Sequence, residues 1–161
     1  MNYRDIPDSS IAGARLIYKN FSGKPSQFNK DGDRNFCVVI PDKEMAEDLI
    51  QDGWNVKIHA PREEGDEPWH YLSVKVKFGS YPPKIVQVTP NRENKMYMCD
   101  EEYVDKYLDS MQFANVDLVI RPYQWENSRG ETGVAAYLKA MYFTPDEDEF
   151  AAKYAAYEEG A

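Results

Sequence analysis

Cysteine and histidine are scarce in this sequence, which has only two of each. Cys37 and Cys99 lie far apart in the chain, and neither histidine is spaced from a cysteine as zinc ligands are. Such sparse and scattered residues predict two reduced thiols, no disulfide and no metal site.

Long hydrophobic runs are also missing. No apolar stretch approaches the roughly 18 residues that a membrane helix needs. The first ten residues, MNYRDIPDSS, lack the basic region and the apolar region of a secretory signal. We therefore expect a protein without a membrane partner, which acts in the cytoplasm of the cell that makes it.

Motifs of the common enzyme classes do not occur either. The sequence lacks a Gly-rich phosphate loop, a Gly-x-Ser-x-Gly elbow and an HExxH motif. Adjacent acids such as Glu63–Glu64 and Glu101–Glu102 are much more often solvated surfaces than general acid–base pairs. We expect no catalytic residues, no cofactor and no enzymatic activity.

Charge is abundant but unevenly distributed in the 161 residues, whose net charge is −9. Residues 144–161 have six acids and one lysine. Residues 71–88, YLSVKVKFGSYPPKIVQV, have three lysines and no acid. Because charge is sorted by segment, an acidic protein can still present a basic surface.

Hydrophobic periodicity predicts a mainly β protein with two or three short helices. Asp42 is a candidate N-cap for a helix at 42–53, and acids in the first turn favour another at 100–111. Strands are expected at 14–21, 36–40, 54–60, 71–78 and 84–89, followed by a hairpin of 115–125 with 133–143. This order matches a five-stranded antiparallel barrel of the OB type from Trp54 onward, with the earlier elements as an N-terminal elaboration. We expect one domain at 1–145 and an acidic C-terminal tail at 146–161.

Alternation along the strands predicts which side chains face away from the core. In residues 71–78 the apolar set is every second residue, and Tyr71, Lys75 and Lys77 lie opposite it. At 54–60, Trp54, Val56 and Ile58 are expected to face the core. The predicted non-core surface comprises Lys57, Tyr71, Lys75, Lys77, Arg121, Tyr123, Trp125, Tyr137 and Lys139. Cations that follow phosphates and rings that stack on bases are what binding of single-stranded nucleic acid requires.

Two loops extend this predicted site. The loop before Phe36 could lay Lys24 and Phe28 over a bound strand, and the loop of the last hairpin could add Arg129. Both could equally be ordinary solvated loops. Strand aromatics also often pack across strands, and exposed strand lysines often prevent edge pairing, so both interpretations stay open at this point.

Five segments are similar to a known family: RNFCVVI, DGWNVK, PPKIVQVT, NVDLVIRPYQWE and GVAAYLKAMYFT, followed by an acidic EDEF. They resemble single-stranded DNA-binding proteins of tailed bacteriophages and prophages, which have an OB fold. The resemblance spans about residues 16–150. It implies a protein that coats and protects single strands during phage DNA replication and recombination, inside the bacterial host cell.

The acidic tail has two interpretations. In single-stranded DNA-binding proteins such tails recruit replication or recombination partners and compete with DNA for the basic groove. Alternatively, Phe150, Tyr154 and Tyr157 have helical spacing, which would let the tail dock on the body as a helix. A homodimer is left open.

The predicted function is therefore largely sequence-independent binding of single-stranded DNA. The alternative is an acidic phage-encoded interaction protein that inhibits a host nucleic-acid enzyme. The net charge favours this alternative, whereas the sorting of cations and aromatic residues disfavours it.

Overall fold

The computed structural model describes residues 4–61, 63–89 and 95–146, so the predicted tail lies outside the described residues except for Asp146. The elements in chain order are β1 (Ser9–Ile11), β2 (Arg15–Asn20), β3 (Arg34–Val39), α1 (Lys43–Gln51), β4 (Val56–His59), β5 (Trp69–Val76), β6 (Lys84–Thr89), β7 (Lys95–Met98), α2 (Glu101–Tyr107), β8 (Phe113–Glu126) and β9 (Thr132–Pro145). The fold is mainly β, as predicted. Neither of these helices is long and apolar enough to cross a membrane.

Both helices begin after an aspartate that caps them: Asp42, as predicted, and Asp100. The backbone N–H of Met45 donates to Asp42 Oδ1 at 2.7 Å, and that of Tyr103 donates to Asp100 Oδ1 at 2.9 Å. Each carboxylate satisfies an N–H group that has no partner within the helix. Ala46 and Leu49 of α1 are buried against the core, whereas the apolar side chain of Ile50 is 45% exposed.

The strands form one mixed sheet, in which neighbours pair in the order β1-β8-β9-β5-β3-β2. β9 pairs in parallel with β5 and with β6, whereas an antiparallel sheet was predicted. β3 pairs with β5 over six residues, from Arg34↔Val76 to Val39↔Tyr71. The N-terminal strands are therefore part of the main sheet and not an elaboration of a body that begins at Trp54.

The two ends of this order, β1 and β2, are consecutive in the chain. Only residues 12–14 separate them, and the N–H of Ala14 donates to the carbonyl of Val116 on β8 at 2.7 Å. Gly13, with a φ of 59°, adopts the left-handed conformation that a glycine tolerates best. The chain thus passes from the edge of β8 to the edge of β3 within a few residues.

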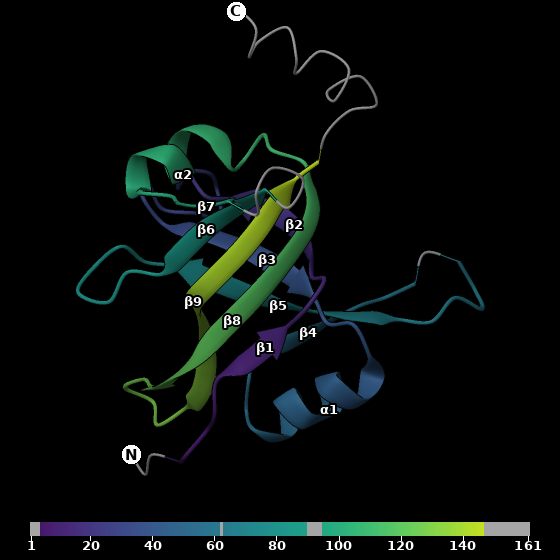
Figure 1. The fold of residues 1–161 in the computed structure, drawn as a ribbon. Helices are drawn as coiled ribbons and strands as arrows, with labels where there is room; N and C mark the ends of the chain where they lie inside the picture. The colour runs from purple at the N-terminus through teal and green to yellow at the C-terminus, as the bar shows by residue number, and fades with distance from the viewer. Residues whose placement is uncertain (1–3, 62, 90–94, 147–161) are drawn as a thin grey trace, which may run out of the picture.

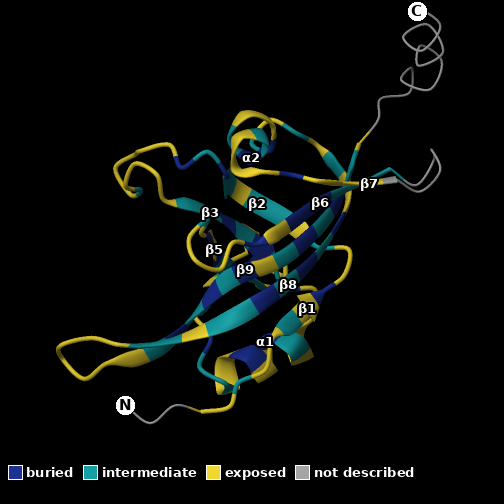
Figure 2. Cartoon of the chain, turned by 60° about the vertical axis from the view of Figure 1, so that its left-hand side comes forward, coloured by how far each residue is buried: buried dark blue, intermediate teal, exposed yellow. Residues whose placement is uncertain are grey.

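The core lies between the long strands. Figure 1 shows β8 and β9 crossing in front of β3 and β5, and buried segments alternate with more exposed ones along these strands in Figure 2. Phe36, Leu72 and Phe143 are fully buried there, and α2 adds Val104. One face of each strand is therefore fixed by burial of apolar side chains, which is the main stabilising contribution to such a domain.

The β4–β5 hairpin extends beyond this core and projects from the body (Figure 1). Ile58 of β4 was predicted to face the core but is 62% exposed, because the core does not reach this part of the hairpin. Trp54 is buried as predicted and bridges Val134 of β9. β7, which pairs with β6, was not predicted at all.

Candidate nucleic-acid interface

The face of β5 that points away from the core carries the basic and aromatic residues of the predicted site. Leu72, Val74 and Val76 are buried, as the alternation predicted. The intervening positions are Trp69, Tyr71, Ser73 and Lys75, with Lys77 just beyond the strand. We call this side of the sheet the outer face.

Tyr137 is the centre of a cluster of cations on the outer face. The sheet register places Tyr137 of β9 beside Lys75 of β5 and beside Arg121 of β8. The ring centroid of Tyr137 lies 6.0 Å from Lys75 Nζ, 5.8 Å from Lys77 Nζ and 5.1 Å from Arg121 Cζ. Each cation is within the range of a cation–π contact. One aromatic ring and three positive charges therefore occupy the same small area, which we call the Tyr137 cluster.

Tyr123 extends this cluster along β8. Its ring centroid lies 5.3 Å from that of Tyr137, in an edge-to-face arrangement, and about half of its side chain is exposed. Trp125 lies farther along β8, and its ring packs closely over the backbone of Gly133 in the last hairpin. A Cβ atom on Gly133 would lie only 2.5 Å from Trp125 Cζ2. Trp125 is thus at the margin of the surface and covers backbone.

Lys139 also lies at the margin. Val119 pairs with Ala140 and Ile120 pairs with Leu138, so a β-bulge leaves Lys139 without a paired residue on β8. Its Nζ donates to Asp8 Oδ2 at 2.6 Å. Because its charge is paired with a carboxylate, Lys139 contributes less to a positive surface than the sequence suggested.

A row of aromatic rings continues along the outer face from β2 to β4. Tyr71 lies 6.3 Å from Tyr18 and 5.6 Å from Trp69 between ring centroids, and Trp69 stacks on His59 at 4.4 Å with an interplanar angle of 10°. We call Tyr18, Tyr71, Trp69 and His59 the aromatic row. Lys57 of β4 pairs with Tyr71 and shares its face, so this predicted cation lies beside the row.

Three members of the aromatic row were missed by the sequence analysis. His59 lies within the predicted strand 54–60, on the same face as Lys57, but was not included in the predicted site. Trp69 continues the alternation of Tyr71 by one further step, and starting the predicted strand two residues earlier would have found it. Tyr18 has no such signal. It lies in a β-bulge of β2 with a φ of 51°, which turns its 64% exposed side chain toward Tyr71.

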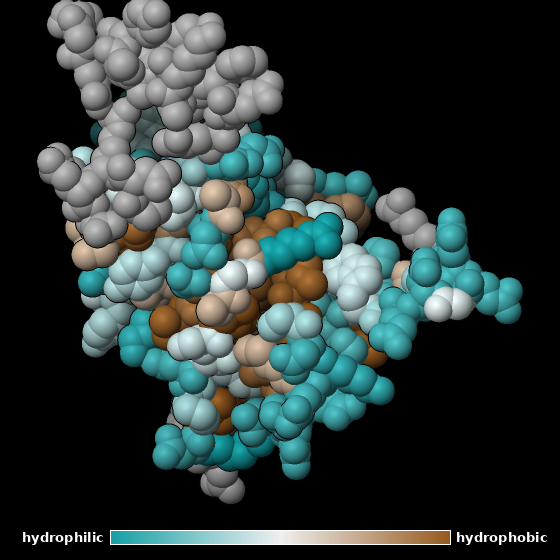
Figure 3. Space-filling model, turned by 45° about the vertical axis from the view of Figure 1, so that its right-hand side comes forward, coloured by the Kyte–Doolittle hydropathy of each residue, from teal (hydrophilic) through white to brown (hydrophobic). Residues whose placement is uncertain are grey.

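Concave surfaces lie at both ends of β5. One, of about 460 Å³, is lined by residues that include Asn35, Lys75 and Lys77. The other, of about 720 Å³, includes Arg15, Tyr18 and Trp69. Figure 3 views the side on which the β4–β5 hairpin projects, and hydrophobic side chains gather there beside hydrophilic ones. The outer face is thus an open, elongated surface that runs from Lys75 and Lys77 at one end to Tyr18 and Trp69 at the other. We call this surface the track.

Cys37 lies on the outer face of β3, opposite Ser73 of β5. Burial raises the pKa of its thiol, and the nearby Lys57 only partly opposes this effect. The thiol is therefore neutral at pH 7 and adds no negative charge to the face. In the described part of the chain, no group of three or more His, Cys, Asp or Glu side chains could hold a metal ion.

The three remaining predicted residues lie on loops and not on the strands of the outer face. Arg129, at the tip of the β8–β9 hairpin, is exposed and lies 3.9 Å from Glu131. Lys24 and Phe28 belong to the loop of residues 21–33 between β2 and β3, for which the sequence left open either an arm over bound DNA or an ordinary solvated loop. Figure 2 shows this loop as a largely exposed projection beside β3 and α2.

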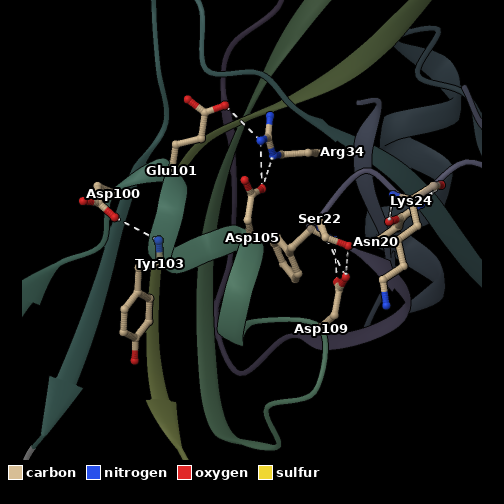
Figure 4. Close-up of polar contacts among 10 residues, drawn as sticks. Asn20, Ser22, Lys24, Arg34, Asp100, Glu101, Tyr103, Asp105 and Asp109 are labelled. Carbon is tan, nitrogen blue, oxygen red and sulfur yellow. Dashed lines mark hydrogen bonds and ion pairs between the residues drawn. The ribbon is translucent and has the colours of Figure 1, made fainter. Parts of the chain in front are cut away.

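The base of the 21–33 loop is held by α2 and the residues after it (Figure 4). Asp109 accepts hydrogen bonds from the N–H of Phe21 at 2.5 Å and from the hydroxyl of Ser22 at 2.6 Å. Arg34 donates to Asp105 at 2.8 and 2.9 Å and pairs with Glu101 at 2.9 Å. The acidic helix therefore fixes the loop and neutralises Arg34, so that Arg34 adds little charge to the track.

Replacing Asp109 by alanine should lower the free energy of unfolding by about 2 kcal/mol, because a half-buried carboxylate that accepts several hydrogen bonds is lost. Urea unfolding monitored by circular dichroism would measure the change. Glu47→Ala, at an exposed position of α1, is the control. Equal midpoints for the two variants would show that the Asp109 contacts do not stabilise the fold.

Comparison with known proteins gives one family and a set of similar structures. A family model described as "Putative phage ssDNA-binding domain" matches residues 1–160. Among curated proteins, no sequence matches the chain.

The structural matches include the single-stranded DNA-binding protein from bacteriophage Enc34 in complex with ssDNA, at a TM-score of 0.56 and 14% identity over 89% of each chain. A C-terminal truncation of that protein also has a TM-score of 0.56 and 14% identity, over 88% of this chain and 87% of that chain. A third match is gp2.5, a single-stranded DNA-binding protein encoded by bacteriophage T7, with a TM-score of 0.47 and 11% identity over 92% of this chain and 97% of that chain. The two Enc34 structures show that this fold is shared.

Proposed function

Because this chain belongs to the family of phage ssDNA-binding domains, we propose that it binds single-stranded DNA through the outer face, largely independently of sequence. The observation that carries this proposal is the Tyr137 cluster, in which Lys75, Lys77 and Arg121 surround one ring. The aromatic row lies on the same face and continues the surface. Phosphates would follow the cations while bases stack on the rings.

The combination suits a single strand better than a duplex. Base–aromatic stacking contributes roughly 1–3 kcal/mol per base and needs bases whose faces are accessible. Every base has such a face, so stacking on Trp69, Tyr71 or Tyr137 would not select a sequence. The rings are partly exposed at the surface, where an unpaired base could reach them.

The proposed contact residues fall into two groups. Lys57, Tyr71, Lys75, Lys77, Arg121, Tyr123 and Tyr137 lie together on the outer face, and Trp69, Tyr18 and His59 join them. Trp125, Lys139 and Arg129 are proposed to act at the margins, and Lys24 and Phe28 from the 21–33 loop.

The strand order supports an OB-type barrel. β2, β3, β5, β9 and β8 are successive neighbours, and the short link from β1 to β2 would close β8 onto β3. α2 precedes β8 in the chain, as the helix between the third and fourth strands does in that fold. We assign the DNA-binding domain to residues 1–145 and the tail to 146–161.

In the cell, the protein is proposed to act without catalysis. It would coat and protect single strands during phage DNA replication and recombination, in the cytoplasm of the bacterial host. The acidic tail would contact replication or recombination proteins.

The test is quenching of tryptophan fluorescence on titration with oligo-dT, compared with a duplex and repeated at two salt concentrations. Quenching by the single strand, a weak response to the duplex and lower affinity at the higher salt concentration are expected. A folded sample that does not respond to oligo-dT at low salt would overturn the proposal. The acidic inhibitor of a host enzyme would then be the better interpretation.

Removing the tail should raise the affinity for single strands severalfold at low salt, because a competing acidic segment is lost. Truncation after Asp146 leaves β9 complete and keeps the hydrogen bond from Asp146 N–H to the Gln112 carbonyl. Anisotropy titrations would measure affinity, and urea unfolding would measure stability. Unchanged affinity with a lower free energy of unfolding would identify the tail as a docked structural segment instead.

A further inference from the structure

We infer that the 21–33 loop recognises the junction between single-stranded and double-stranded DNA, with the Phe28 ring stacking on the end of the duplex. The inference rests on the proposed function, because the single strand that leaves the junction would lie on the outer face. It adds a second binding site, for a base pair instead of an unpaired base.

The loop is built as a fixed projection. Asn20 and Lys24 exchange two hydrogen bonds, of 2.8 and 3.1 Å, and Asn29 Nδ2 donates to the carbonyls of Lys24, Lys30 and Asp33 at 2.9–3.1 Å. Asn35 of β3 donates to Asn29 Oδ1 at 2.8 Å. These contacts satisfy the loop internally, so it does not depend on bound DNA for its conformation.

The two ends of the loop meet at Gly23 and Gly32, and we call this close approach the neck of the loop. Gly32 N–H donates to the Gly23 carbonyl at 2.8 Å, and a Cβ atom on Gly23 would lie 2.8 Å from the Gly32 carbonyl carbon. Only glycine allows the two strands of the neck to approach this closely. Below the neck, Asp109 and Lys19 tie the chain to the end of α2 (Figure 4 shows Asp109). A flexible arm that closes over single-stranded DNA would need neither the hydrogen bonds within the loop nor those that tie its base to α2.

The tip of this projection presents a single large ring. Phe28 lies in the short turn closed by Ser26 and Asn29, and its side chain is 91% exposed. Lys24 and Lys30, on either side of it in the sequence, are exposed as well. A phenyl ring this exposed contributes nothing to the core, and flanking lysines are suited to the two phosphate backbones of a duplex end.

The loop lies at one end of the track on the outer face. Asn29, Gly32 and Asp33 line the concave surface that also contains Lys75 and Lys77, whereas Phe28 does not line it. Single-stranded DNA that passes over the Tyr137 cluster therefore reaches the 21–33 loop where it leaves the outer face. A rigid exposed ring at that exit can stack on the first base pair, in the way that apolar wedges contact base steps.

The test compares two labelled DNAs by fluorescence anisotropy: a 12-nucleotide single strand, and the same strand joined to a short hairpin duplex at its 5′ or its 3′ end. Wild-type protein should bind one of the tailed hairpins about tenfold more tightly than the single strand, as expected for one added stack. Phe28→Ala should lower the affinity for that tailed hairpin about tenfold more than the affinity for the single strand, and so remove the preference, whereas Phe28→Tyr should keep it. Ile58→Ala, which removes another exposed apolar side chain, is the control.

Two outcomes would overturn the inference while leaving the proposed function intact. Equal affinity of the wild type for all three DNAs would show that no junction site exists. An equal loss of affinity for the single strand and the tailed hairpins in Phe28→Ala would show that Phe28 stacks on unpaired bases. Failure of the single strand to bind at all would instead overturn the proposed function.

Discussion

Replacing Lys75, Lys77 and Arg121 together by glutamine is expected to weaken binding of single-stranded DNA by about two to three orders of magnitude at about 50 mM salt. Each phosphate contact on a single strand displaces roughly 0.7 counterion, so three lost contacts should also reduce the slope of log K against log salt by about 2. Anisotropy titrations with oligo-dT over a range of salt concentrations would measure both quantities. The reason for so large an effect is that the three cations surround one ring and would contact successive phosphates.

A matched control removes positive charge elsewhere. Lys43 and Lys106 are exposed on α1 and α2, away from the outer face. Their double replacement by glutamine removes two positive charges, compared with three in the triple variant, and should reduce the salt slope by much less than two thirds of the change in the triple variant. If both sets of variants lost the same affinity, net charge and not the Tyr137 cluster would control binding.

Removal of the Trp69 ring is expected to have the second large effect. Trp69 lies between Tyr71 and His59 in the aromatic row, so Trp69→Ala interrupts the row as well as removing one stacking surface. The affinity for oligo-dT should fall by at least about tenfold, since one base–aromatic stack contributes about 1–3 kcal/mol. Tyr107→Ala, which removes a half-exposed ring on α2, should leave the affinity unchanged.

Trp69 should also be the tryptophan whose fluorescence is quenched when DNA binds. Trp54 is buried in the core, and Trp125 packs over the backbone at Gly133. Trp69→Phe keeps an aromatic surface, so its affinity should remain close to that of the wild type while most of the fluorescence quenching disappears. Persistent quenching in Trp69→Phe would place the bases against another tryptophan.

Alternation correctly predicted the two faces of β5. Leu72, Val74 and Val76 are buried, whereas Lys75 and Lys77 are exposed, because strand side chains alternate with a period of two and only one face meets the core. The caps Asp42 and Asp100 begin helices through contacts three residues away. Such features depend on neighbours in the sequence, so the sequence is sufficient to predict them.

Errors arose where a residue's environment depends on distant segments. Ile58 has the expected alternation, yet no part of the core extends far enough to cover it. Lys139 follows Tyr137 by two residues, but a shift in the pairing of β8 with β9 and the charge of Asp8 change its surroundings. Nothing in the local sequence identifies that shift or that partner.

What the sequence by itself determined is which residues are basic or aromatic and which strand face carries them. Tertiary structure alone decided that they meet. Tyr137 reaches Lys75 because β9 pairs in parallel with β5, about sixty residues earlier in the chain, and Tyr18 reaches Tyr71 through a bulge with a left-handed residue. Pairing between distant strands is selected by burial of the whole core, and this collective free energy cannot be read from any one segment.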